Sequence, residues 1–293
     1  MKLTMAKRQY SILDLINLSA QYLEEKGCSS PRLDAELLLG HVLGLERLDL
    51  YLNAAKPLNE REVGEYRVLI GQRGQRIPVA YLTGRREFYS LPLQVSPEVL
   101  IPRPETELVV DKALELIDPA KPVEILELGT GSGAIALALA SQDPNIRLTA
   151  TDVSPAALEV AKLNASKLEL SAQIDFIESD LFAKVEGRFN LICSNPPYIP
   201  KDELAELEPE VGREPAAALD GGVDGLDFYR RIFNQAADFL AEPGFVVLEI
   251  GWGQACRVKK LGEKAGLVWQ ETMRDYGGVE RVVVFKWPKK QKS

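Results

Sequence analysis

The segment Asn195-Pro196-Pro197-Tyr198 combines residue types that suit the binding of a planar nitrogen group. Two consecutive prolines fix the backbone and remove two N–H donors. What remains is a stiff row of acceptors, the side-chain oxygen of Asn195 and the carbonyl of Pro196, with the ring of Tyr198 as a flat surface beside it. We predict that the whole segment, Pro197 included, binds a planar –NH2 group as substrate, with Asn195, Pro196 and Tyr198 as catalytic residues. The alternative is a loop that the prolines merely stiffen.

A glycine-rich loop predicts a cofactor site. It follows an apolar run, precedes a helical pattern, and consists of Gly129, Thr130, Gly131, Ser132 and Gly133. Glycines let a backbone turn sharply and approach a ligand closely, and the helix that follows presents free N–H groups. Asp152 ends the next apolar run, 23 residues after Gly129, where its carboxylate can accept hydrogen bonds from both hydroxyls of a ribose. The pattern predicts an adenosine-containing cofactor; a glycine turn without a ligand is the alternative.

Glu127 favours S-adenosylmethionine over a dinucleotide as the adenosine-containing cofactor. Gly129, Gly131 and Ala134 also satisfy the dinucleotide-binding pattern GxGxxG/A. Glu127, however, directly precedes the loop, where we expect it to face the ligand. A carboxylate is a poor neighbour for a pyrophosphate and a good one for the ammonium and sulfonium groups of S-adenosylmethionine.

The end of the third apolar run offers contacts for an adenine ring. Asp180 can accept a hydrogen bond from the adenine amino group, and Leu181 and Phe182 can pack on the ring. A simple turn at the end of a strand is the alternative interpretation of Asp180.

Composition excludes several classes of protein. The formal net charge is −8 and the sequence pI is about 5.0, which disfavours a free-standing binder of duplex nucleic acid. The chain has a single histidine, His41, and three cysteines, Cys28, Cys193 and Cys256, without CxxC spacing. We therefore expect no metal site, and we expect reduced thiols in a cytoplasmic protein without a membrane span.

The order of apolar runs predicts an α/β fold from residue 103 onward. Solidly apolar strands that alternate with helical patterns are typical of a parallel sheet covered on both faces. The predicted strands are Val123–Leu128, Ile146–Val153, Ile174–Ile177, Phe189–Ser194 and Phe245–Ile250, followed by an antiparallel hairpin over Leu267–Met273 and Val279–Trp287. The predicted helices are Ser132–Ser141, Ser154–Leu168 and Leu226–Leu240.

The first 102 residues differ in character from the rest. Residues 1–76 have helical periodicity, with Ser30 and Asn59 as helix caps, and predict a small bundle that docks a partner. Residues 77–102 are punctuated by proline and read as a structured linker, with a hairpin over Glu87–Val95 that turns near Ser90-Leu91-Pro92. We thus predict three parts: 1–76, 77–102 and 103–293.

These motifs together resemble the HemK/PrmC family, the release factor glutamine methyltransferases, which are class I S-adenosylmethionine-dependent methyltransferases. Besides the glycine loop, Asp152, Asp180 and NPPY, the resemblance rests on RIPVAYLTG, EFY and VLIPRPETE at residues 76–84, 87–89 and 99–107. It extends to EP…ALDGGVDGLDFYR at 214–230 and LEIGWGQ at 248–254, and so covers nearly the whole chain.

The resemblance implies a Rossmann-like fold with a seven-stranded, mostly parallel sheet after the helical bundle and hairpin linker. It also implies methyl transfer to the glutamine side chain of the Gly-Gly-Gln motif in class I peptide chain release factors. Asn195 would then contact both the cofactor and the substrate. Since His41 is distant in sequence and no strong base lies near NPPY, we expect catalysis by positioning. We expect neither nucleic-acid nor membrane binding.

Three other functions stay open at this point: a nucleic-acid aminomethyltransferase, which shares NPPY; a nicotinamide-dependent oxidoreductase; and a docking protein without enzymatic activity.

Four side chains also have open roles. Arg103 and Glu105 either close over the methionine end of the cofactor or form a surface ion pair. Glu249 either lines the pocket or pairs with an arginine, and His41 is expected to be structural.

Overall fold

The computed structural model describes residues 10–118 and 120–288. The chain forms two compact units. The helical unit contains the residues up to Gly84 together with Pro209–Arg213, and the sheet unit contains Arg85–Glu208 and the residues from Glu214 onward. The predicted linker, 77–102, is thereby divided between the units after Gly84.

The helical unit is built from short amphipathic helices around one apolar core. Ser11 and Asn59 each cap a helix through a reciprocal capping box, and Pro31 occupies the first turn of the second helix after Ser30. Ile12, Leu38 and Leu50 are fully buried between the helices. The helices are α1 Ile12–Glu25, α2 Pro31–Leu43, α3 Arg47–Leu52, α4 Glu60–Arg73 and α5 Val79–Thr83.

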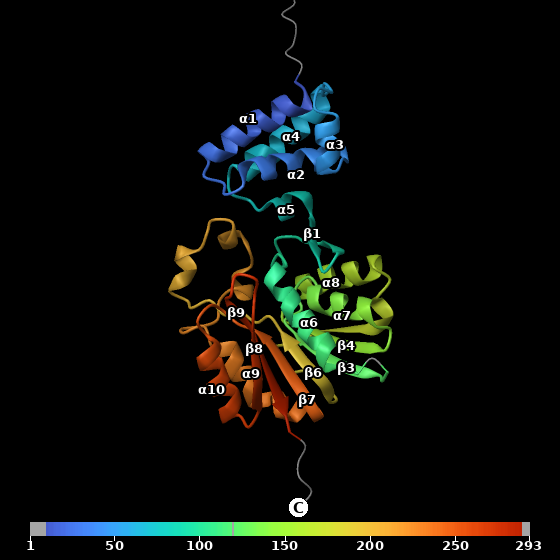
Figure 1. The fold of residues 1–293 in the computed structure, drawn as a ribbon, viewed down its shortest axis with the longest axis vertical. Coiled ribbons are helices and arrows are strands. Elements are labelled where there is room, and N and C mark those ends of the chain that lie inside the picture. The colour runs from blue at the N-terminus through green and yellow to red at the C-terminus, as the bar shows by residue number, and fades with distance from the viewer. Residues whose placement is uncertain (1–9, 119, 289–293) are drawn as a thin grey trace, which may run out of the picture. The chain divides into compact units, whose positions relative to one another are not determined.

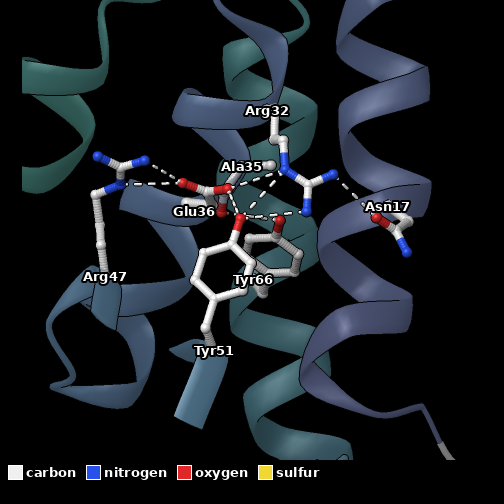
Figure 2. A network of polar contacts seen from close by, with 7 residues as sticks. All are labelled: Asn17, Arg32, Ala35, Glu36, Arg47, Tyr51 and Tyr66. Atoms are coloured by element: carbon white, nitrogen blue, oxygen red, sulfur yellow. Dashed lines mark hydrogen bonds and ion pairs between the residues drawn. The ribbon is translucent and has the colours of Figure 1, made fainter. Parts of the chain in front are cut away.

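A buried carboxylate joins two of these helices, α2 and α3 (Figure 2). Glu36 on α2 is 1% exposed and accepts hydrogen bonds from Arg32 at 3.1 Å, from Arg47 at 3.0 Å and from the hydroxyl of Tyr51. Burial acts to raise the pKa of Glu36, but the hydrogen bonds from Tyr51 and Arg47 outweigh it and lower the pKa. Because both oxygens of Glu36 already accept hydrogen bonds from protein donors, this network is structural and has no free acceptor position for a ligand.

A short segment from the second half of the chain belongs to the helical unit. Glu210 accepts hydrogen bonds from Arg73 at 2.7 Å and from Arg76 at 2.6 Å, and Arg73 also binds Asp34 at 2.7 Å. Burial alone would raise the pKa of Glu210, but the two guanidinium groups lower it to about 2. Two ion pairs of Glu210, one with the nearly buried Arg73 and one with Arg76, therefore hold Pro209–Arg213 in this unit.

A hairpin begins the sheet unit. Its strands are β1 Arg85–Phe88 and β2 Leu91–Gln94. Tyr89 and Ser90 both have positive φ, 51° and 61°, which is the backbone of the two-residue turn that suits twisted strands. The hairpin is where we predicted it, but its turn is Tyr89-Ser90, and Leu91 and Pro92 already lie in β2.

The main sheet has seven strands in the order β5-β4-β3-β6-β7-β9-β8. The first five pair in parallel, and β9 is antiparallel to both β7 and β8. The strands are β3 Val123–Leu128, β4 Ile146–Asp152, β5 Ile174–Glu178, β6 Phe189–Ser194, β7 Leu240–Glu249, β8 Val268–Arg274 and β9 Glu280–Trp287. This confirms the predicted fold class and the terminal hairpin.

Helices cover both faces of this sheet (Figure 1). Side chains alternate along each central strand, so that Ile125 faces a core with α6, α7 and α8, while Leu126 faces a core with α9 and α10. The helices are α6 Glu107–Leu116, α7 Ala134–Gln142, α8 Pro155–Lys167, α9 Asp227–Phe239 and α10 Ala255–Lys264. Within the described residues, no helix is long and apolar enough to cross a membrane.

Candidate functional site

The order of strands reverses at β3, and the predicted site lies at that reversal. The chain runs from β3 to β4 and β5 on one side, then returns to β6 and β7 on the other. Leu128 pairs with Ser194, so Gly129 and Asn195 leave the sheet side by side. Ligands of open parallel sheets bind at such a point. A cavity of the sheet unit lies there, and the predicted residues that line it are Gly129, Gly131, Asp152, Asp180, Leu181, Asn195 and Pro197.

The glycines of the loop have two different tasks. Gly129 and Gly131 have φ of +72° and +57°, and a Cβ atom at either position would meet nothing within 4 Å. Their open side is the side on which a ligand can approach the backbone. Gly133 instead permits close packing, because its Cβ would lie 3.0 Å from Leu137 and 3.2 Å from Ala161.

Asp152 connects the loop to the next helix and keeps acceptor capacity for a ligand. Oδ2 accepts from the backbone N–H of Gly131 at 2.8 Å, and Oδ1 accepts from that of Ser154 at 2.9 Å. A carboxylate has about four acceptor positions, so about two are left on the side of the cavity. Two hydroxyls on adjacent carbons, as in a ribose, match this remaining capacity.

Glu127 lies beneath the loop, 1% exposed, and does not line the cavity. Its Oε2 accepts from the hydroxyl of Thr130 at 2.7 Å and from the backbone N–H of Ala136 at 3.1 Å. Burial raises the pKa of Glu127 to about 8, against the lowering effect of these two hydrogen bonds, and nearby Asp152 adds to the rise. The side chain thus braces the loop and does not face the ligand as we expected from the sequence; Thr130 and Ser132 are buried with it.

Glu127→Gln is expected to weaken the dependence of stability on pH. Between the ordinary pKa of 4.5 and the folded value of about 8, the folded protein holds a proton that the unfolded chain has released, so stability falls as pH rises. A single such proton gives a slope of at most about 1.4 kcal/mol per pH unit. Urea unfolding from pH 5 to pH 8 measures it. Glu124→Gln on the exposed face of β3 is the matched control, and equal slopes for wild type and Glu127→Gln would contradict this pKa.

The adenine-binding prediction is only partly matched by the geometry. Asp180 lines the cavity and pairs with Arg231 at 2.7 Å, and Leu181 lines the cavity with a positive φ of 51°. Phe182 does not: it is 2% exposed and stacks on Phe239 in the core, with ring centroids 4.8 Å apart. The turn at Leu181 sends the next side chain inward, so packing on a ligand ring by Phe182 is a prediction that the structure corrects.

Several apolar lining residues were missed from the sequence, among them Val153 and Phe228. Phe228 on α9 is the aromatic side chain at the cavity, and Val153, which follows Asp152, is 61% exposed there. Val153 carried a signal, since an apolar residue directly after a ribose-binding acid is placed to contact the base. Phe228 carried none, because its position depends on how α9 packs.

The NPPY segment is held rigidly at the cavity, where Asn195 and Pro197 line it and the predicted site residues Pro196 and Tyr198 do not. The backbone carbonyl of Tyr198 accepts from Nε2 of Gln254 at 2.8 Å. Gly221 and Gly225 pack so closely against Tyr198 that a Cβ on either would lie 2.7 Å or less from its backbone. Only glycine fits at these two positions, which gives the DGGVDG motif a physical reason, and the hydrogen bond from Gln254 gives one to the GWGQ motif. Pro196 is buried, and burial raises the pKa of Tyr198 far above its usual range.

The structure places the four side chains whose roles stayed open. Glu105 is half-buried in the 3-10 helix Pro104–Thr106. Arg103 pairs with the buried Glu214, which also accepts from the backbone N–H of Ile101 at 2.9 Å. Glu249 is 2% exposed, accepts a hydrogen bond from Thr106 and does not line the cavity. Among the described residues no arginine forms an ion pair with it, although the charge of Arg281 acts to lower its pKa. His41 lies exposed in the last turn of α2, which leaves it no place in the core.

Comparisons with known proteins address the family directly. A family model of the PrmC N-terminal domain matches residues 14–84, and a model of the methyltransferase small domain matches residues 109–210. A release factor glutamine methyltransferase of Geobacter sulfurreducens is 42% identical over 94% of this chain and 96% of the relative. The chain belongs to the release factor glutamine methyltransferase family. A relative of the same name from Moorella thermoacetica is 44% identical over 87% of this chain and 91% of its own length.

The fold agrees with membership of the family. A crystal structure of a methyltransferase from Pyrococcus furiosus is similar with a TM-score of 0.51 and 21% identity, covering 68% of this chain and 89% of that one. The predictions of the family, the Rossmann-like fold and a methyltransferase activity are confirmed. The family uses S-adenosylmethionine as methyl donor, and this donor accounts for the glycine-rich loop. The two alternatives, an oxidoreductase with a nicotinamide cofactor and a docking protein without enzymatic activity, are therefore not needed.

The residues present fit that donor. The open side of the two glycines leaves room against the backbone, Asp152 retains acceptors for a ribose, and the negative charge of Asp152 at the cavity suits a cationic ligand. Gly129, Gly131 and Asp152 would hold the donor, which supplies an electrophilic methyl group on a sulfonium.

Proposed function

We propose that this chain methylates the side-chain amide nitrogen of the glutamine in the Gly-Gly-Gln motif of class I peptide chain release factors. The observation that carries the proposal is the placement of Asn195. It lines the cavity beside the glycine loop, while its Nδ2 donates to Thr106 at 3.1 Å. Its Oδ1 is therefore left to accept an N–H from a carboxamide, and the Pro196 carbonyl is proposed to accept the other.

Positioning supplies the catalysis in this proposal. An amide nitrogen is a weak nucleophile because its lone pair is delocalised. Two fixed acceptors orient the NH2 group so that its nitrogen faces the methyl carbon, and pre-orientation of this kind can contribute about 7–11 kcal/mol to lowering a barrier. The N–C bond forms as the S–C bond breaks, with the electron pair of that bond moving to sulfur. The carbonyl dipoles stabilise the positive charge that develops on nitrogen.

The proton leaves the methylated nitrogen after transfer. Tyr198 cannot take it as a phenolate, because burial and the neighbouring Glu249 keep its hydroxyl protonated. Once methylated, the amide cation is strongly acidic, so water that enters the cavity accepts its proton and no dedicated base is required.

We propose that the helical unit docks the release factor. Among its described residues, the most exposed apolar side chains are Leu48 and Leu52, both on α3, at 70% and 73%. Two exposed leucines that lie one turn apart on a helix favour an apolar protein surface as the partner over a polar molecule. The net charge of −8 opposes nucleic acid as the substrate.

The deciding experiment offers the protein labelled S-adenosylmethionine with a release factor, RNA and DNA together. We expect label in the release factor, at the Gly-Gly-Gln glutamine by mass spectrometry, and none in a factor with Gln replaced by Ala. A short Gly-Gly-Gln peptide should be methylated with a much lower kcat/KM, because it cannot dock. Label in nucleic acid, or at another residue, would overturn the proposal.

A further inference from the structure

Behind Asn195 lies a line of hydrogen bonds that reaches the last residue of β7. Nδ2 of Asn195 donates to Oγ1 of Thr106 at 3.1 Å, and the Thr106 hydroxyl donates to Oε2 of Glu249 at 2.6 Å. Thr106 ends the single-turn 3-10 helix Pro104–Thr106, and Glu249 directly follows Leu248, the residue that pairs with Ser194 at the end of β6, just before Asn195. Three segments that are distant in sequence therefore meet behind one side chain.

The chemistry of the three groups fixes the direction of these bonds. An ionised carboxylate only accepts, so the hydroxyl of Thr106 must donate its one proton to Glu249. The lone pairs of the hydroxyl are then left to accept, and only the NH2 end of the Asn195 amide can donate to them. The opposite orientation would set the Asn195 oxygen against a hydroxyl oxygen that has no proton left.

Burial separates the two supporting residues from any ligand. Thr106 is 4% exposed and Glu249 is 2% exposed, and neither lines the cavity, whereas Asn195 does. Among the described residues, no group donates a hydrogen bond to Oδ1 of Asn195. Oδ1 of Asn195 is thus a free acceptor at the cavity. Thr106 and Glu249, which fix the orientation of the amide, are out of reach of a substrate.

We propose that Glu249 and Thr106 are positioning residues for methyl transfer, which orient the Asn195 amide so that its oxygen, and not its NH2 group, faces the substrate nitrogen. The proposal rests on the function proposed above. With the amide reversed, the NH2 group of Asn195 would meet the NH2 group of the substrate, and both would lose a partner. Glu249 and Thr106 therefore act through Asn195 and should affect turnover more than cofactor binding.

The surroundings of Glu249 make the orientation of the Asn195 amide sensitive to pH. Burial raises its pKa to about 7, while hydrogen bonds from Thr106 and Tyr198 and the charge of Arg281 on β9 act to lower it. Glu105, in the same 3-10 helix as Thr106, acts to raise it, and the Tyr229 hydroxyl on α9 donates to the Glu249 backbone carbonyl at 3.0 Å. A protonated Glu249 can donate to Thr106 as well as accept from it, so the orientation of Asn195 is no longer enforced. Transfer is then expected to fall as pH decreases through this pKa.

Thr106→Val tests the hydrogen bond without changing the shape of the side chain. We expect kcat for methylation of a release factor to fall on the order of 10–100-fold, because the donor of Asn195 loses its partner, while the Kd of S-adenosylmethionine stays within about twofold. Thr106→Ser restores the hydroxyl and should restore kcat to within about threefold of wild type. Thr149→Val, on β4 of the same unit, is the matched control and should behave as wild type.

Glu249→Gln tests the direction of the bonds. Glutamine, like the protonated acid, can donate or accept, so kcat/KM should be about three- to tenfold lower than the wild-type plateau and flat from pH 6 to 8, where wild type shows an acidic limb. Should Thr106→Val fail to fold, the pH dependence of kcat/KM for Glu249→Gln alone decides whether the inference holds. Wild-type kcat for Thr106→Val, no rescue by serine, or an acidic limb kept in Glu249→Gln would overturn the inference. An inactive wild type would instead refute the proposed function.

Discussion

Asn195→Ala is expected to lower kcat for methyl transfer by about 10²–10³-fold, the usual cost of removing one fixed polar group that acts on the reacting centre. The side chain lines the cavity and its amide is anchored through Thr106, so its oxygen is already oriented before a substrate arrives. Alanine removes the acceptor and leaves the glutamine nitrogen free to rotate away from the methyl carbon. Single-turnover kinetics with a release factor and saturating S-adenosylmethionine measure the effect directly.

Cofactor affinity separates this role from a structural one. Gly129, Gly131 and Asp152 lie on other elements of the cavity, so the Kd of S-adenosylmethionine for Asn195→Ala should stay within about threefold of wild type. Asn190→Ala serves as the matched control, since Asn190 is an exposed asparagine within β6, the strand that Asn195 follows. An Asn195→Ala protein with more than a tenth of wild-type kcat would contradict the proposed mechanism.

The sequence predicted those parts of the site that depend on local pattern. The bounds of β3 and β6 agree with the structure, because both are mainly apolar runs that end at a turn. Once two such parallel strands are neighbours, their carboxyl ends must meet, so the glycine loop and NPPY were expected to share a cavity. The hairpin was also found from its turn residues, although its turn lies at Tyr89-Ser90.

The rest depends on contacts across the fold, which no local pattern contains. Phe182 turns inward because the backbone at Leu181 has positive φ and because Phe239, 57 residues later, offers it a stacking partner. Glu127 looked like a ligand contact from its place in the chain, yet Thr130 and Ala136 occupy its carboxylate. The hydrogen bond between Thr106 and Glu249 joins residues 143 positions apart. Sequence periodicity places elements, but it does not say which side chains close a network between them.

Asp152→Ala is expected to raise the Kd of S-adenosylmethionine by about 10²–10⁴-fold. The predicted contacts are two hydrogen bonds from ribose hydroxyls to a charged carboxylate, each worth about 1.5–3 kcal/mol, and every 1.4 kcal/mol changes affinity about tenfold. The carboxylate binds the cofactor in the ground state and the transition state alike, so kcat at saturating cofactor should fall less than about tenfold. Calorimetric titration gives the Kd, and steady-state kinetics give kcat.

The two backbone hydrogen bonds of Asp152 require a control, because the carboxylate also accepts from Gly131 and Ser154. If alanine acted by loosening the loop, the thermal midpoint without cofactor would fall together with affinity. If it acts through lost ribose contacts, the midpoint without cofactor changes little, and the stabilisation that the cofactor adds to wild type disappears. Asp175→Ala, an exposed carboxylate on the adjacent strand β5, should leave both quantities unchanged. An unchanged Kd for Asp152→Ala would remove the ribose from this position, and with it the orientation that brings the methyl carbon toward Asn195.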